Sequence, residues 1–271
     1  MPKRAYLAAI DACQRQLRAG ESYEICLTTA LEAAGGFDTA ASYSALRTNN
    51  PAPYAALLRF GDVDILSSSP ERFLKIDRTG VIESKPIKGT TARGTTADED
   101  ETRREALRRD EKTRSENLMI VDLSRHDLGA VCELGSVSVP RLMAIESYAT
   151  VHHMVSTIQG VLRAEVDAIE ATRRCFPGGS MTGAPKLRTV EILRHLEGEP
   201  RGPYSGALGY FSCNGTADLS IVIRTAVIRP EGVAIGTGGA ILAVSDPESE
   251  LEEARLKGQV VVDALRRTAT D

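Results

Sequence analysis

The chain has 271 residues, of which 42% are hydrophobic and 26% charged, a mix that is typical of a soluble globular protein and excludes general disorder. Its net charge of −4 is too mild to indicate a nucleic-acid or membrane-surface protein. Its five cysteines form no C-x-x-C pair, which argues against a disulfide framework and a structural zinc site. No apolar run approaches the ~20 residues of a membrane span, and the polar start excludes a signal-peptide core, so we expect a cytoplasmic protein.

In the first third of the chain, two helices alternate with short strands. Apolar side chains recur at helical spacing over residues 3–19, and alternation over residues 23–29 predicts a strand. Asp38 is expected to cap a helix that ends near residues 49–51. An antiparallel meander is predicted next, with strands over 54–60, 63–67, 72–76 and 81–84. Residues 86–97 lack periodicity and predict a loop, and a helical stretch is predicted over 98–128.

The rest of the chain repeats this alternation of strands and helices. The predicted strands cover residues 136–145, 148–161, 204–212 and 218–228, and a further strand ends in residues 236–239. Helices are predicted near 165–175, over 186–197 and from Asp246-Pro247 to about Arg267, with a loop over 176–185. Antiparallel strands interspersed with helices favour an α+β fold. We expect one domain that spans residues 1–271.

Two glycine-rich segments invite comparison with phosphate-binding motifs. In GGSMTGAPK (178–186), two residues separate Gly183 from Lys186, so the Walker pattern fails. In GTGGAI (236–241), Ile241 takes the place of the third glycine of G-x-G-x-x-G. Each segment can still present backbone N–H groups to a carboxylate, and the alternative for each is an ordinary tight turn.

The last predicted helix carries a possible cation site. Glu250, Glu253 and Lys257 share one helical face. Two carboxylates beside an ammonium can hold magnesium together with an anionic ligand, because magnesium takes one or two protein carboxylates and accepts substrate oxygens. The alternative is a solvated helix with charge pairs. Glu116, which precedes an apolar helical run, has the same two possible roles.

Four further residues have both a functional and a structural interpretation. Lys88 lies in the predicted loop after a strand and is either reactive or simply exposed. His152 and His153 lie in an alternating strand, so one ring is expected to point inward and the other outward. Arg224 lies in a predicted apolar strand and needs a partner, which a substrate carboxylate would supply.

Taken together, these segments resemble the chorismate-utilising enzymes, which include anthranilate, aminodeoxychorismate, isochorismate and salicylate synthases. The matching segments run in order along the chain: GESYEICLTTAL, SSSPERF, KPIKGTTARG, SENLMIVDLSRHDLG, VHHMVSTIQG, FPGGSMTGAPK, YSGALGYFSCNG, IRTAVI, GTGGAI and DPESELEEARLKG. The resemblance covers the catalytic domain only, so we expect the N-terminal portion of longer relatives to be absent. It implies a sandwich of two packed, largely antiparallel sheets flanked by helices.

The resemblance also assigns roles to individual residues. It implies that Glu116 and Glu253 hold magnesium, with Glu250 nearby, and that Glu71 is the acid that protonates the departing C4 hydroxyl. The residues expected to bind substrate are Lys257, Gly238 and Gly239 at the ring carboxylate, Tyr204 and Arg224 at the enolpyruvyl carboxylate, and Thr90 and Thr182 along the ring. His153 matches a family histidine near the ring carboxylate.

Two positions indicate which activity to expect. Glu24 stands where the water-adding enzymes carry a lysine base, and Lys88 stands in the P-I-K-G-T segment typical of aminodeoxychorismate synthases. We therefore expect magnesium-dependent amination of chorismate through Lys88, which must be uncharged to attack. No glutaminase signature is present, so ammonia would come from a glutamine amidotransferase partner, and pyruvate elimination would need a separate aminodeoxychorismate lyase.

Two alternatives remain open at this point. The first is an anthranilate synthase component I, which releases pyruvate itself. The second is an inactive, truncated chorismate-binding protein, because Thr113 stands where relatives usually carry an acid.

Overall fold

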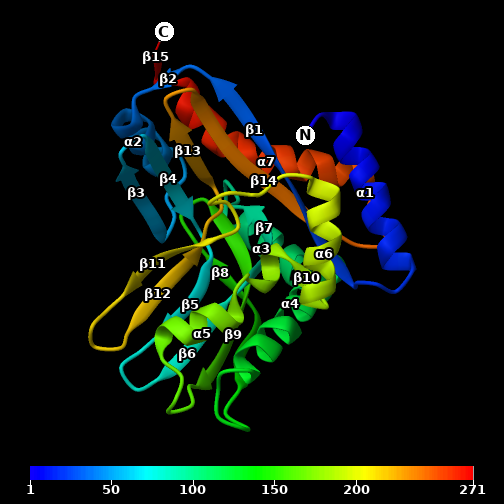
Figure 1. Ribbon diagram of the computed structural model, residues 1–271. Coiled ribbons are helices and arrows are strands. Elements are labelled where there is room, and N and C mark those ends of the chain that lie inside the picture. Colours follow the sequence, from blue (N-terminus) through cyan, green and yellow to red (C-terminus); the bar gives the residue numbers. More distant parts are fainter. Residues whose placement is uncertain (271) are drawn as a thin grey trace. The chain divides into compact units, whose positions relative to one another are not determined.

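The computed structural model describes residues 1–270, which form two compact units (Figure 1). Unit 1 comprises Met1–Glu71, Ser180–Leu208 and the described residues from Ser220 onward. Unit 2 comprises Arg72–Gly179 and Gly209–Leu219. The single domain expected over 1–271 stays a prediction.

Unit 1 is built on a six-stranded sheet whose determined strand pairings are antiparallel. Its strands are, in spatial order, β10 (Gly183–Ala184), β1 (Glu24–Ala34), β14 (Gly232–Ile241), β13 (Thr225–Arg229), β4 (Val63–Ser69) and β3 (Tyr54–Phe60). A separate pair joins β2 (Gly36–Phe37) to β15 (Ala269–Thr270). The long β1–β14 ladder places Gly239 opposite Leu27 and Gly238 opposite Thr28.

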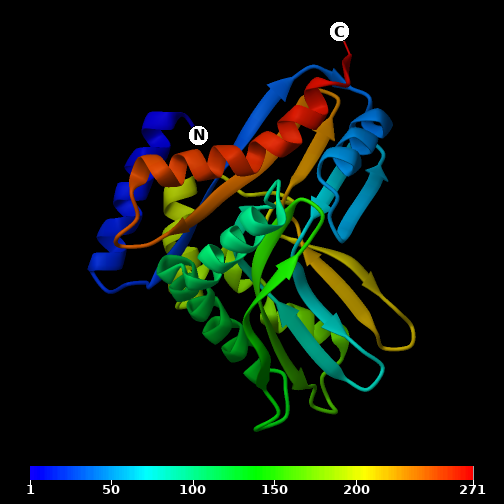
Figure 2. The ribbon, with the colours of Figure 1, turned by 180° about the vertical axis from the view of Figure 1, so that it is seen from behind.

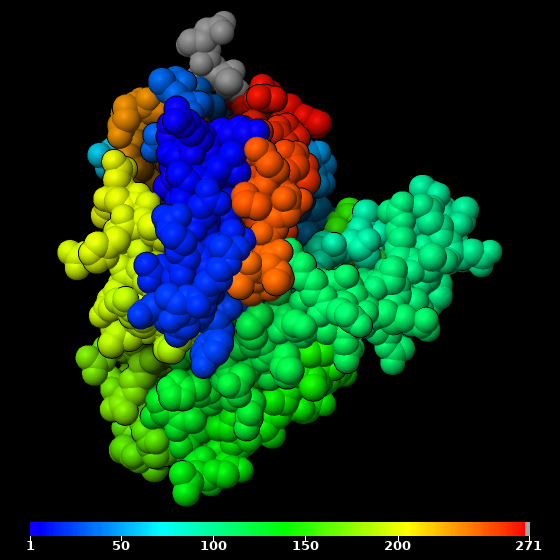
Figure 3. All heavy atoms as spheres, turned by 90° about the vertical axis from the view of Figure 1, so that its right-hand side faces the viewer, coloured from blue at the N-terminus to red at the C-terminus, as the bar shows by residue number. Residues whose placement is uncertain are grey.

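Four helices pack on this sheet and enclose two apolar clusters. They are α1 (Lys3–Arg18), α2 (Thr39–Asn49), α6 (Lys186–Glu197) and α7 (Pro247–Arg266). One cluster joins α1, α6, β1 and the first turns of α7, and the other joins α2, β4, β13 and the last turns of α7. Figure 3 shows α1 and α7 side by side at the surface. Asp38 and Asp246 cap α2 and α7 as predicted, since each accepts a backbone N–H from three residues ahead.

A second sheet has seven strands. Its order is β11 (Ala207–Phe211), β12 (Ala217–Ile221), β5 (Arg72–Ile76), β6 (Val81–Lys85), β9 (Val151–Val161) and β7 (Ile87–Ala92), and β8 (Ser138–Ser147) also pairs with β9. The helices of unit 2 are α3 (Ala97–Arg109), α4 (Glu111–Gly129) and α5 (Ala168–Cys175), followed by the short 3-10 turn η1 (Gly179–Met181). Figure 2 shows α4 running along β9. The predicted α+β class with two largely antiparallel sheets is confirmed.

The prediction of a loop over residues 86–97 is wrong, because residues 87–92 form strand β7. β7 pairs with β9 in a register that sets Thr90 opposite His153, and the pairing shifts between Ile87 and Thr90. Gly89 lies in this shift with a φ of +87°, which favours glycine. Lys88 therefore lies in an irregular strand and not in a loop. A partner more than 60 residues away holds the segment extended, and no local periodicity could reveal it.

Three other boundaries differ from the prediction. The helical stretch over 98–128 is two helices, and Asp110 ends α3 and caps α4 by accepting the Thr113 N–H. The strand predicted over 218–228 is interrupted, because Arg224 adopts a φ of +52° between β12 and β13. The strand predicted to end at residues 236–239 continues to Ile241, so GTGGAI is strand and not a turn. Within residues 1–270, no helix is long and apolar enough to span a membrane.

Candidate active site

The predicted site residues fall into two groups, one in each unit. Unit 1 carries Glu71, Thr182, Tyr204, Arg224, Gly238, Gly239, Glu250, Glu253 and Lys257. Unit 2 carries Lys88, Thr90, Glu116 and His153.

In unit 1, α7 presents three charged side chains to a glycine of β14. A Cβ atom added to Gly239 would lie 3.5 Å from Glu250 Oε2, 3.8 Å from Lys257 Nζ and 4.0 Å from Glu253 Oε1. The helical spacing of these residues thus brings them to one place, as the sequence predicts. The missing side chain of Gly239 leaves a small cradle, defined here by Gly239, Glu250, Glu253 and Lys257, in which a ligand oxygen can approach all three charges.

The three charges of the cradle differ in their surroundings. Glu250 is only 2% exposed, and its Oε1 accepts a hydrogen bond from Ser245 Oγ at 2.7 Å. Glu253 is half exposed and forms an ion pair with Lys257, with Nζ 2.5 Å from Oε1. Lys257 Nζ also donates to the Gly238 carbonyl at 3.3 Å. The buried Glu250 carboxylate is held in place, and the Glu253 carboxylate is open to solvent. A cation held by this pair would keep coordination positions free for substrate oxygens.

Magnesium fits this donor set. It needs only one or two protein carboxylates and completes its shell with water and substrate oxygens. Among residues 1–270, no group of three or more His, Cys, Asp and Glu side chains is arranged to hold a metal. A magnesium ion at the cradle would have the carboxylates of Glu250 and Glu253 within reach, and Lys257 would add a positive charge for an anionic ligand.

Arg224 and Tyr204 lie near the same helix and strand. The Arg224 guanidinium donates to the backbone carbonyl of Lys257, and its burial lowers the pKa of this group, while the Tyr204 hydroxyl and Glu253 counteract that shift. The Tyr204 ring packs directly on Gly236, where any Cβ atom would overlap it. Burial raises the pKa of Tyr204 well above its ordinary value, so its hydroxyl stays protonated and can donate to a carboxylate. Arg224 lies between β12 and β13 and not within a strand, and its binding of a substrate carboxylate stays a prediction.

Thr182 and Glu71 are both buried in unit 1. The Thr182 carbonyl accepts the Cys26 N–H at 2.8 Å, which ties η1 and β10 to β1. Glu71 is 6% exposed, its N–H donates to Ser69 Oγ at 3.3 Å, and its carbonyl accepts the Ile221 N–H at 3.0 Å. The role of Glu71 as the acid stays a prediction.

In unit 2, Thr90 and His153 meet across the β7–β9 ladder. Thr90 Oγ1 and His153 Nδ1 are hydrogen bonded at 2.7 Å. The two histidines point to opposite faces, as predicted: His152 is 1% exposed and His153 is half-buried. His152 is the histidine that points inward, and both of its ring nitrogens have hydrogen-bond partners, Asp100 and Ser147.

Lys88 and Glu116 lie on neighbouring elements of unit 2. Lys88 is half-buried in the β7 irregularity, and a Cβ atom on the adjacent Gly89 would overlap the Thr113 methyl group. Glu116 follows Thr113 by three residues on α4 and lies 3.8 Å from Lys112 Nζ. Thr113, which departs from the acid expected in relatives, is therefore in contact with the strand that carries the predicted nucleophile.

Sequence reasoning missed Arg201 and Glu197 of unit 1. Arg201 donates to Glu197, to the carbonyls of Met181 and Cys26 and to Ser205, all within 3.1 Å. Glu197 also accepts from the N–H and the hydroxyl of Thr28. These bonds fix the neighbours of Thr182 and Tyr204. The Glu–Arg spacing of four residues was the available signal, but it is common on exposed helices.

Comparison with known proteins identifies the family. The sequence pattern of the family described as chorismate binding enzyme matches residues 1–263. The chain belongs to the chorismate binding enzymes. The predicted resemblance is thus confirmed.

Individual chorismate binding enzymes are similar over nearly the whole chain. The chain is 54% identical to a chloroplastic aminodeoxychorismate synthase of Arabidopsis thaliana over 98% of its own length and 29% of that protein's. It is 41% identical to an anthranilate synthase component 1 of Haloferax volcanii, with 97% of the chain and 51% of the relative covered. The crystal structure of anthranilate synthase component I from Streptococcus pneumoniae TIGR4 matches with a TM-score of 0.88 and 31% identity, over 96% of the chain and 58% of that protein. The chain therefore spans only about a third to a half of its curated relatives.

Proposed function

We propose that this chain aminates chorismate at C4 and produces 4-amino-4-deoxychorismate, as an aminodeoxychorismate synthase. One observation carries the proposal: relatives of that name are 54–56% identical to the chain, whereas anthranilate synthases of similar coverage are 40–41% identical. Lys88 in the P-I-K-G-T segment supports the same choice.

The proposed reaction uses Lys88 as a nucleophile. Its uncharged amine bonds to C2 of chorismate, the C1=C2 π electrons move to C1–C6, the C5=C6 π electrons move to C4–C5, and the C4–O bond breaks. Glu71 gives its proton to the departing hydroxide, which leaves as water. Ammonia then bonds to C4, the π electrons return to C5–C6 and C1–C2, and the C2–N bond to Lys88 breaks, which releases its amine. The proton that ammonia gives up restores the Glu71 acid. Two substitutions through one fixed nucleophile replace a single difficult one.

Substrate carboxylates are the groups that the other residues would bind. Lys257 and the backbone at Gly238 and Gly239 would hold the ring carboxylate, and Tyr204 and Arg224 the enolpyruvyl carboxylate. Thr90 and Thr182 would line the ring, with His153 near the ring carboxylate. Glu116 and Glu253 would hold magnesium, with Glu250 nearby, and the bound ion would neutralise the ring carboxylate.

The ammonia source and the following step lie outside this chain. We propose that a glutamine amidotransferase subunit or domain supplies ammonia, and that a separate aminodeoxychorismate lyase consumes the product. The product would serve p-aminobenzoate and folate synthesis in the cytoplasm.

The product of the reaction tests the proposal. The protein is incubated with chorismate, a magnesium salt and an ammonium salt, and the mixture is analysed by chromatography with and without added lyase. A product that yields p-aminobenzoate only after lyase is added supports the proposal. Anthranilate fluorescence with release of pyruvate would show an anthranilate synthase, a second candidate that the Streptococcus pneumoniae structure favours at 31% identity. Chorismate binding without either product would show an inactive binding protein.

A further inference from the structure

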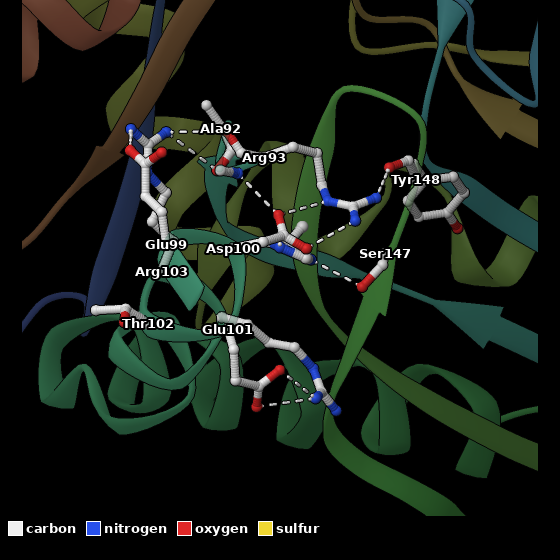
Figure 4. Close-up of polar contacts among 12 residues, drawn as sticks. Ala92, Arg93, Glu99, Asp100, Glu101, Thr102, Arg103, Ser147 and Tyr148 are labelled. Carbon is white, nitrogen blue, oxygen red and sulfur yellow. Dashed lines mark hydrogen bonds and ion pairs between the residues drawn. The ribbon is translucent and has the colours of Figure 1, made fainter. Parts of the chain in front are cut away.

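A polar network in unit 2 joins the start of α3 to the end of β7 (Figure 4). The Arg93 guanidinium donates through Nε and Nη2 to the two carboxylate oxygens of Asp100, each at 2.7 Å. The Gly94 N–H donates to Asp100 Oδ1 at 2.8 Å, and His152 Nε2 lies 3.0 Å from the same oxygen. Because an ionised carboxylate only accepts hydrogen bonds, His152 Nε2 is the protonated nitrogen. The bonds from Arg93, Gly94 and His152 hold the pKa of the Asp100 carboxyl well below its ordinary value.

The same network holds the turn between β8 and β9 at three points. Arg93 Nη1 donates to the Tyr148 carbonyl at 2.8 Å, as Figure 4 shows, and the Arg93 N–H donates to the Thr150 carbonyl at 3.1 Å. His152 Nδ1 is hydrogen bonded to Ser147 Oγ at 2.8 Å. Residues 147–150 lie at the surface, but their hydrogen bonds to Arg93 and His152 hold them in place.

This turn carries an aromatic ring that touches His153. The Tyr148 and His153 rings are edge-to-face, with centroids 5.4 Å apart and planes at 61°. Edge-to-face contact is a favoured arrangement of aromatic rings. Thr90 holds the Nδ1 atom of the same imidazole, and the Tyr148 hydroxyl is anchored by donating to Glu146 Oε2 at 2.9 Å. The orientation of the His153 ring is thus set by two contacts, one from β7 and one from the turn.

We propose that Arg93, Asp100 and His152 are positioning residues for His153, because they hold the turn that presses Tyr148 against its imidazole. The effect on turnover rests on the proposed function, whereas the effect on the imidazole rests on contacts within unit 2 alone. The two parts can therefore fail separately.

A double-mutant cycle tests the effect on turnover. Lysine cannot reproduce the three side-chain donations of Arg93, so we expect R93K to lower kcat for chorismate amination about 10-fold with KM changed less than about 2-fold. Y148A is expected to cause the same loss, and R93K/Y148A no further loss, because both changes act through one contact. Y148F keeps the ring and is expected to recover most of the turnover that Y148A loses. R104K is the matched control, because Arg104 forms only an exposed pair with Glu101 on the same helix.

Nuclear magnetic resonance of the histidine rings tests the geometry independently of activity. The chain has four histidines, so a protein labelled with 15N-histidine gives a simple spectrum, in which H153Q identifies the His153 signals. We expect R93K and Y148A to shift or broaden the His153 ring signals and R104K to leave them unchanged. Unchanged His153 signals in R93K, or additive kinetic losses in the double mutant, would overturn the proposal. Absence of amination in the unmodified protein would refute the proposed function, and the ring signals would still decide the positioning role.

Discussion

In unit 1 three predicted charged residues gather around a glycine, whereas in unit 2 the predicted Thr90 meets a histidine. Gly239 makes room for two carboxylates and an ammonium group, all supplied by one helix, α7. His153 meets Thr90 across a strand ladder and Tyr148 from a turn. The charges around Gly239 suit the binding of charged ligand groups, and the contacts of His153 suit the orientation of its imidazole. We therefore expect substitutions in the cradle to act mainly on substrate affinity and substitutions of Lys88 and His153 mainly on turnover.

Replacement of Lys88 by alanine is expected to have the largest effect. Loss of the nucleophile should lower kcat at least about 10³-fold, because no other group can form the bond to C2. Chorismate binding, followed by calorimetry, should change much less. Lys75→Ala is the matched control, since Lys75 is an exposed lysine of the same unit. A K88A protein that turns over at the unmodified rate would remove Lys88 from the reaction.

Replacement of Glu253 by glutamine is expected to weaken magnesium binding and thereby chorismate binding. We expect kcat/KM at limiting magnesium to fall about 10- to 100-fold, with partial recovery when magnesium is raised. The adjacent Glu252→Gln is the control, because Glu252 is exposed and does not line the cradle. Equal losses in both variants would contradict a specific role for Glu253.

Alanine substitutions at the two neighbouring glycines of β14 should have different effects, one on chorismate binding and the other on the stability of the fold. A Cβ atom at Gly239 meets the cradle charges at ordinary contact distances, so Gly239→Ala should fold normally and raise KM for chorismate about 10-fold by filling the space. A Cβ atom at Gly238 overlaps the Leu27 carbonyl, so Gly238→Ala should lower the free energy of unfolding by roughly 1–3 kcal/mol. Urea unfolding and steady-state kinetics measure both. A destabilised G239A with normal KM would contradict the cradle.

The smallest expected effect is the change in thermal stability when the Asp100 carboxylate becomes protonated at low pH. The pKa of this carboxyl is lowered in the folded protein, so its contribution to stability is present above the unfolded pKa of about 3.9 and is lost as the pH falls toward the folded value. The melting temperature of the unmodified protein should exceed that of Asp100→Asn most above about pH 5, and this gap should narrow below about pH 4. Asp98→Asn, an exposed position of the same helix, is the control. A gap that stays constant down to pH 2 would contradict the ionic role of Asp100.

The same comparison shows what the sequence reveals and what it does not. Glu250, Glu253 and Lys257 share a face because helical spacing is local, and the caps at Asp38 and Asp246 are local as well. The strand β7 was mistaken for a loop because its partner, β9, lies far along the chain. The strand predicted over 218–228 is interrupted at Arg224 by a positive φ. The apolar residues on both sides of Arg224 give no sign of this interruption in the sequence. Sequence reasoning missed the Arg93 network because its members come from the residue after β7, from α3 and from β9, which only strand pairing brings together.

The covalent step on Lys88 is the central claim, and intact-protein mass spectrometry tests it directly. The protein is mixed with chorismate and a magnesium salt in the absence of ammonia, quenched, and digested to locate any added mass. We predict an adduct of one chorismate less one water on the peptide that contains Lys88, which disappears when an ammonium salt is added before the quench. An unmodified Lys88, in protein that forms 4-amino-4-deoxychorismate once ammonia is supplied, would contradict the account.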